Sequence, residues 1–228
     1  AVRIDAITDD GQYHAWTEIN VPQRPFEIEN VDTVTVPLAQ SGYTTEYLRY
    51  RITINDRPNE TNYYRIVIDK QTTLWGYNHE EGGDDYIYWT KHSYNFIGRE
   101  DVVLTDGQPT TGDDEDNGLF DTAKNIYGVF DDTRFRNTSY TMTVYNNTKI
   151  ETGSDSGYFS GMDVIIRLMS ITETEYYYLK ALNLVDSDAY DETINEPIKY
   201  PSNVHGGTGM VGISTEVTQT IHIISSSH

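Results

Sequence analysis

The residues best suited to chemistry by their type and spacing are acidic and lie in one short segment. Asp113-Asp-Glu-Asp-Asn-Gly118 carries oxygen-bearing side chains at its first, third and fifth positions and glycine at its sixth, an order typical of calcium-binding EF-hand loops. The candidate ligands are therefore Asp113, Glu115 and Asn117. The twelfth position is Lys124, where such a loop needs a bidentate glutamate, and no predicted helices flank the segment. We therefore favour a solvated acidic loop and predict neither a metal nor a cofactor.

Residues that enzymes use as nucleophiles do not form a recognisable motif. The chain has no cysteine, which excludes thiolate catalysis and cysteine-bound zinc. The Gly153–Gly157 segment differs from the Gly-x-Ser-x-Gly elbow because Asp155 occupies the central position. The six histidines show no spacing typical of zinc enzymes. We predict that the chain is not an enzyme, and a hydrolase with a site hidden among its many acids is the least favoured alternative.

Aromatic residues form a second candidate site, a band that could bind a glycan or a peptide. Tyrosine and tryptophan suit such surfaces because they combine apolar area with a polar tip. The competing interpretation, which we favour, is that the band fills the core and its rim. Its members are Trp75, Tyr77, Tyr86, Tyr88 and Trp89.

The elements that would position these residues are mostly strands. Period-2 alternation predicts a hairpin from Val2 to Val21, and a second hairpin in which Tyr47–Ile54 pairs with Asn62–Asp69. Short aromatic strands are predicted on both sides of the Gly82-Gly83 turn, and a closing strand runs from Gly209 to Ile224. Many short strands with one late helix predict a mainly β fold, an antiparallel β-sandwich or open barrel with one accessory helix.

That helix is predicted over residues 172–184. Thr172 can cap it, and Glu175 completes a Thr-x-x-Glu capping box. Tyr177, Ala181 and Leu184 share one helical face, with Leu179 and Leu182 beside them. We therefore expect the stripe of Tyr177, Ala181 and Leu184 to pack against the sheet.

The segment after the helix is rich in glycine and begins with prolines. Pro197 and Pro201 prevent a further helix. The glycines permit backbone conformations that other residues resist, and an asparagine can hydrogen-bond the nearby backbone. We predict a structural latch that joins the helix to the closing strand, in which the glycines supply either positive φ or close backbone approach. Its residues are Asn203, Gly206, Gly207 and Gly209, and we interpret His205 as a turn residue.

The overall charge restricts the possible partners. The chain has 228 residues, with 36 acidic and 16 basic side chains and a formal net charge of −20. This balance disfavours nucleic acid and anionic lipid surfaces, which need clustered lysine and arginine. No apolar run is long enough for a transmembrane helix.

Three signatures in order resemble a family of Bacteroidota outer-membrane lipoproteins whose C-terminal domain has no assigned function. They are Asn62-Tyr-Tyr-Arg-Ile66, Val129-Phe-Asp-Asp-Thr-Arg-Phe135 and the pair Glu175–Leu182 with Asn195–Gly209. The last matches the family pattern EP-x4-SN-x2-GG-x-G. The resemblance implies terminal strands and a linker of an Ig-like domain over 1–28, and a β-rich lipoprotein domain over 29–228. It also implies a lipid anchor outside this chain, an association with TonB-dependent receptors and no catalytic residues.

The resemblance adds one candidate modification site. Exported proteins of this phylum carry O-glycans at Asp-Ser/Thr-small apolar sequences, which Asp121-Thr-Ala123 matches. Thr122 is therefore the candidate attachment residue.

These observations lead to one favoured function and one rival of another class. We expect a non-enzymatic lipoprotein that is anchored in the outer membrane at the cell surface. It would serve as accessory or partner subunit of a TonB-dependent transporter or another large envelope complex. The rival is a glycan- or peptide-binding adhesion module that uses the aromatic band. A barrel protein that co-purifies in fixed stoichiometry would separate the two.

Overall fold

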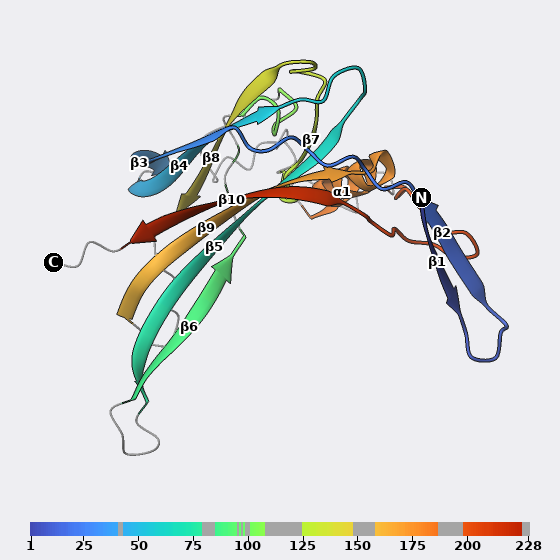
Figure 1. The fold of residues 1–228 in the computed structure, drawn as a ribbon, viewed down its shortest axis with the longest axis horizontal. Helices are drawn as coiled ribbons and strands as arrows, with labels where there is room; N and C mark the ends of the chain where they lie inside the picture. The colour runs from blue at the N-terminus through green and yellow to red at the C-terminus, as the bar shows by residue number, and fades with distance from the viewer. Residues whose placement is uncertain are drawn as a thin grey trace.

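The protein is built from antiparallel sheets and one helix in the part of the chain that the structure describes. The computed structural model describes residues 1–40, 43–78, 85–94, 96, 98, 101–107, 125–147, 158–186 and 198–224. The predicted mainly β class is confirmed, and the sheets form an open sandwich (Figure 1). The elements are β1 Val2–Ile7, β2 His14–Ile19, β3 Asn30–Gln40, β4 Tyr43–Asn55, β5 Tyr63–Asn78, β6 Asp85–Ser93, β7 Val129–Asp131, β8 Ser139–Asn147, β9 Tyr158–Ile171, α1 Glu173–Val185 and β10 Thr215–Ile224.

Two of the sheets pack face to face and share the main core. One has the order β3-β4-β8, and the other has the order β10-β9-β5-β6 with β7 added to β5. Alternate side chains of β4 and β5 point inward, and Tyr50, Ile52, Ile66 and Ile68 are at most 1% exposed. Their register neighbours on β8 and β9 are apolar as well, since Ile52 pairs with Met142 and Ile66 pairs with Leu168. Period-2 burial on both sheets therefore produces the sandwich.

The predicted pairing of Tyr47–Ile54 with Asn62–Asp69 is wrong. These segments belong to β4 and β5, which lie in different sheets. Their apolar faces meet across the core instead of lying side by side, and alternation alone does not distinguish the two arrangements. The connection 56–62 crosses between the sheets, and its direction is set by a buried polar network. Asn62 donates from its backbone and its side chain to Asp132 Oδ2, at 2.8 and 3.1 Å.

The first hairpin, β1–β2, forms as predicted and makes a sheet of its own. It projects away from the sandwich (Figure 1). Its inner strand meets the 203–209 segment through a single bridge, in which Trp16 and His205 exchange backbone hydrogen bonds of 3.0 and 2.8 Å. The closing strand β10 begins at Thr215, six residues later than predicted from Gly209, because residues 202–211 form this docking turn.

The helix lies where the sequence predicts it, but another face is buried. Tyr176, Leu179 and Asn183 are buried, whereas Tyr177 and Leu184 are 51% and 40% exposed. The predicted stripe is therefore wrong, and the buried face is displaced from it by about one residue. Tyr176 occupies that face and packs against Tyr63 with ring centroids 4.9 Å apart. Thr172 caps the helix by accepting from the Glu175 amide at 3.2 Å. The described residues include no helix long and apolar enough to cross a membrane.

Candidate functional site

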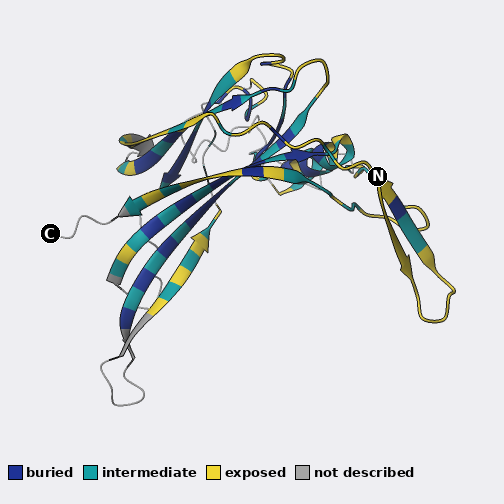
Figure 2. Ribbon diagram, viewed as in Figure 1, coloured by how far each residue is buried: buried dark blue, intermediate teal, exposed yellow. Residues whose placement is uncertain are grey.

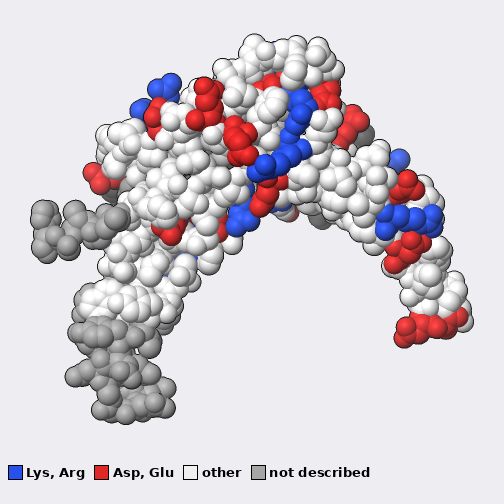
Figure 3. Space-filling model, in the orientation of Figure 1, with Lys and Arg blue, Asp and Glu red and all other residues white. Residues whose placement is uncertain are grey.

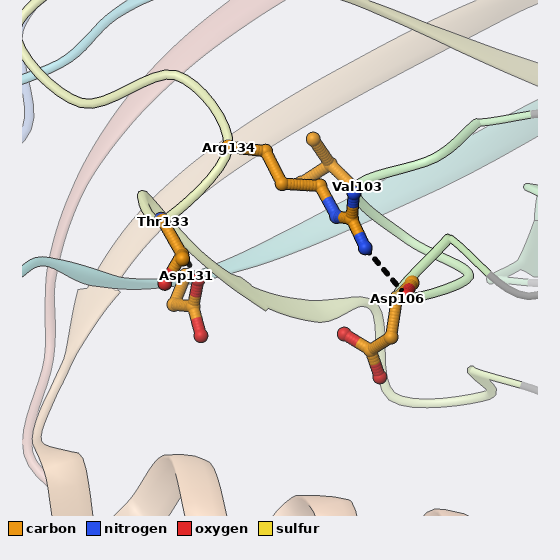
Figure 4. Close-up of a pocket in the computed structure, with 5 residues that line it drawn as sticks. All are labelled: Val103, Asp106, Asp131, Thr133 and Arg134. Atoms are coloured by element: carbon orange, nitrogen blue, oxygen red, sulfur yellow. Dashed lines mark hydrogen bonds between the residues drawn. The ribbon is translucent and has the colours of Figure 1, made fainter.

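A polar pocket of about 560 Å³ lies at one end of the sandwich, above helix α1 (Figure 4). Three segments meet there: the turn 101–107, the end of β7 with the turn that follows it, and residues 176–180 of α1. The pocket contains charges of both signs and one apolar side chain. Its lining residues are Val103, Asp106, Asp131, Thr133 and Arg134.

The first wall of the pocket is organised by a buried carboxylate, Asp101. Its Oδ1 accepts the backbone amides of Val103 and Leu104 at 3.0 and 3.3 Å and the Tyr140 hydroxyl at 2.9 Å. Its Oδ2 accepts the Thr143 amide of β8 at 2.8 Å. These bonds fold residues 101–107 into a turn and fix it to the sheet, so that Val103 and Leu104 enter the core.

The second wall is positioned by another buried acid, Asp132, which belongs to the Val129–Phe135 signature. Asp132 is 0% exposed and accepts from Asn62 and from Arg136, the latter at 3.0 Å. Asp131 and Arg134, on either side of it, line the pocket instead. Asp131 Oδ1 accepts the Thr133 amide at 2.9 Å, which closes the turn locally.

Helix α1 supplies two polar groups below the pocket. The Tyr176 hydroxyl donates to Asp131 Oδ2 at 3.2 Å, and the Lys180 ammonium forms an ion pair with the Asp106 carboxylate. Burial raises the pKa of Tyr176, and the nearby charges of Asp131 and Asp106 raise it further. The tyrosine therefore stays protonated and donates.

The charges of this pocket are not all neutralised by one another. The Arg134 Nη2 donates to the Asp106 backbone oxygen at 2.7 Å (Figure 4), and among the described residues the guanidinium has no carboxylate partner. Asp131 likewise receives hydrogen bonds from neutral donors only within the part of the chain that the structure describes. The pocket therefore presents one cation and one anion to a ligand.

The predicted aromatic band is divided between the two faces of its sheet. Trp75 is the register partner of Tyr88, which is 66% exposed. Trp89 pairs with the buried Leu74, so it lies on the face of the sheet opposite to Trp75 and Tyr88. Its indole covers Gly76, where an added Cβ would lie 3.2 Å from the ring. Tyr77 and Tyr86 pair in register, and their side chains lie outside what the structure describes.

The remaining predicted ligands cannot be placed. Asp113, Glu115, Asn117 and the candidate glycosylation residue Thr122 lie outside the described residues. Within the described ranges, no group of three or more metal-ligating side chains could hold an ion. Acidic and basic residues are interspersed on the face shown in Figure 3.

The 203–209 segment closes on itself and holds the N-terminal hairpin. Asn203 donates to the Val211 carbonyl at 2.8 Å and accepts the Val211 amide at 2.9 Å. Gly206 and Gly209 have positive φ, at 76° and 127°, whereas Gly207 does not. The His205 ring stacks on Trp16 with centroids 4.1 Å apart, a contact that the sequence did not indicate.

Sequence reasoning missed the pocket as well as the hairpin contact. Asp131 and Arg134 are inside a signature that was recognised but given no role. Asp106 is joined to Lys180 across 74 residues of sequence, so no local spacing could have revealed that pair. Two opposite charges three residues apart, on either side of a buried aspartate, were the one local signal.

The chain matches a known protein family. A family model described as "Domain of unknown function (DUF4249)" matches residues 1–220, which include both the hairpin and the sandwich. No curated protein matches the chain.

Proposed function

The chain belongs to the DUF4249 family, and we propose that it acts as a non-enzymatic partner subunit of an outer-membrane complex. The partner is a TonB-dependent transporter-like β-barrel protein or another large envelope assembly, and a lipid anchor holds the protein at the membrane. The resemblance of residues 175–182 and 195–209 to outer-membrane lipoproteins supports this location. The observation that carries the proposal is the outer edge of strand β1, which has no strand partner among the residues that the structure describes.

The hydrogen-bond pattern of the hairpin defines this edge. Thr8 donates to Tyr13 across the turn at 3.1 Å, and Trp16 bonds outward to His205. Hydrogen-bonded and non-hydrogen-bonded pairs alternate in antiparallel ladders, so residues 2, 4 and 6 bond β2. The amide and carbonyl groups of Arg3, Asp5 and Ile7 therefore point away from β2, toward the open edge.

This edge lacks several of the features that protect other edge strands, and its two charged residues, Arg3 and Asp5, are paired with each other. All six residues of β1 are exposed (Figure 2), and the strand contains no proline and no lysine. The exposed apolar side chains of the hairpin include Ile4, Ile7 and Tyr13, at 46%, 62% and 72%. An unprotected, partly apolar edge is a template for strand addition by another chain. The hairpin is thus suited to accept a strand from a partner.

Purification from native membranes with two variants of one residue tests this proposal. Ile7→Pro removes an outward amide and leaves the β1–β2 ladder intact, whereas Ile7→Ala removes the same side chain and keeps the amide. We expect the parent and Ile7→Ala chains to co-purify with one barrel protein in fixed stoichiometry. Ile7→Pro should recover at most about one tenth of it, a loss of about 1.4 kcal/mol. A parent chain that is extracted as a monomer in mild detergent would contradict the proposal.

A second candidate function is the binding of a glycan or a peptide on the outer face of β5 and β6. The observation that favours it is the exposed Tyr88 ring beside Trp75 in the register. Glycan-array binding that Tyr88→Ala abolishes, and Tyr13→Ala leaves unchanged, would support it. Absence of such binding, together with a stoichiometric barrel partner, would decide for the first function.

A further inference from the structure

We infer that the pocket between the 101–107 turn and the turn after β7 binds a small zwitterion that carries a carboxylate and an ammonium group. A free α-amino acid and a short peptide share this chemistry. The inference goes beyond the proposed function, because it concerns a small ligand and does not depend on the hairpin edge.

The carboxylate of the ligand would be bound by Arg134. One N–H of its guanidinium donates to the Asp106 carbonyl. The remaining N–H donors of the planar group suit a bidentate carboxylate. The bond to Asp106 also orients the group. Gly107, with φ of 76°, leaves the necessary space, because a Cβ there would lie 2.4 Å from Arg134 Nη2. The arginine is thus held in place by the turn that faces it.

The ammonium of the ligand would be bound by Asp131. Its two oxygens accept from the Thr133 amide and the Tyr176 hydroxyl, and each oxygen keeps further acceptor capacity. The other pocket acid, Asp106, is already paired with Lys180. Asp131 is therefore the carboxylate that an incoming cation can neutralise, while Arg134 serves an incoming anion.

The remaining wall and the size of the pocket restrict the ligand. Val103 lines the pocket but is 3% exposed and belongs to the core, so it offers a ligand little apolar area. A volume of about 560 Å³ is within the range of small-ligand sites and admits an amino acid or a few linked residues. Phosphate esters are disfavoured, because Asp131 and Asp106 would repel their charge.

Calorimetric titration of the full chain tests the inference with four probes. They are L-leucine, L-leucyl-L-leucine, N-acetyl-L-leucine, which lacks the ammonium, and L-leucinamide, which lacks the carboxylate. We expect leucine or the dipeptide to bind, and each blocked probe to bind at least about tenfold more weakly. Leucine alone would identify a free amino acid, and the dipeptide alone would identify a peptide. Equal binding of blocked and unblocked probes, or no binding of any probe at millimolar concentration, would overturn the inference.

Charge-removing variants locate the binding. Arg134→Gln and Asp131→Asn should each weaken binding at least about tenfold. The matched controls, Arg51→Gln on β4 and Asp32→Asn on β3, remove the same charges from exposed positions elsewhere and should bind as the parent does. If Asp131→Asn lowers the melting temperature, the Arg134→Gln variant alone decides the test, because Arg134 is exposed. An Arg134→Gln chain that binds like the Arg51→Gln chain would show that the pocket is not the site.

Discussion

Replacing Gly206 with alanine should release the β1–β2 hairpin from the rest of the protein. Gly206 has φ of 76°, and a Cβ built on it would lie 2.3 Å from the His14 carbonyl oxygen. The left-handed conformation costs a non-glycine residue about 1–2 kcal/mol, and the overlap adds about 1–3 kcal/mol. Both costs disappear when the segment moves away from β2.

The contacts that would resist this release are few. They include two backbone hydrogen bonds between Trp16 and His205, each worth about 0.5–1.5 kcal/mol. They also include one ring stack, worth about 0.5–1.5 kcal/mol. The expected strain is therefore comparable with the whole contact. We expect the hairpin to open at least tenfold more often, which is about 1.4 kcal/mol.

Amide hydrogen exchange measured by NMR reports this opening directly. The Trp16 and His205 amides should exchange at least tenfold faster in Gly206→Ala, while the core amides of β5 and β9 should not change, because no hairpin residue belongs to the core clusters. Gly207→Ala is the matched control. Gly207 has no positive φ, and its Cβ would make ordinary contacts of 3.5 and 3.7 Å. Equal exchange rates in the two variants would refute the reasoning.

Three further predictions concern stability. Leu179→Ala should cost about 2–3 kcal/mol by urea unfolding, and Leu184→Ala less than about 0.5, because the first side chain is 8% exposed and the second 40%. Equal costs would mean that the buried helix face is misassigned. Glu175 has an unpartnered buried Oε2 among the described residues, and burial raises its pKa. Glu175 therefore stabilises the folded state most below its unfolded pKa, and this stabilisation is lost as pH rises through its folded pKa. Glu175→Gln should raise the melting temperature at pH 7 by roughly 2–4 °C and should not raise it at pH 3. A gain at pH 3 alone would contradict this sign. Asn62→Ala removes a hydrogen-bond donor from the buried carboxylates of Asp56 and Asp132 and should cost about 2–3 kcal/mol. The exposed Asn30→Ala should cost almost nothing. A small cost for Asn62→Ala would show that this network does not hold the connection between the two sheets.

Much of the fold could be predicted because burial follows the local pattern. The alternation of Tyr50 and Ile52, and of Ile66 and Ile68, correctly indicated strands with one buried face. Strand partners could not be predicted, because the same alternation suits a hairpin and two strands that face each other across a core. The crossing depends on Asp132, far along the chain from Asn62, which local periodicity does not reveal.

The candidate site was harder to predict than the fold. The pocket charges come from three segments. The buried Asp101 and Asp132 fix the turns and so decide which neighbouring side chains face the pocket. In the glycine-rich segment the type of residue was informative, but its spacing did not say which glycine has positive φ. That depended on the approach of His14 to Gly206, a contact between segments far apart in the sequence.

Hydrogen exchange of strand β1 in the native complex tests the proposed partner function most directly. The amides of Arg3, Asp5 and Ile7 point to the open edge, so they should exchange rapidly in the isolated chain. In the complex extracted from outer membranes they should be protected at least tenfold, because a partner strand would bond them. Equally rapid exchange of all three amides in the complex and in the isolated chain would contradict the account.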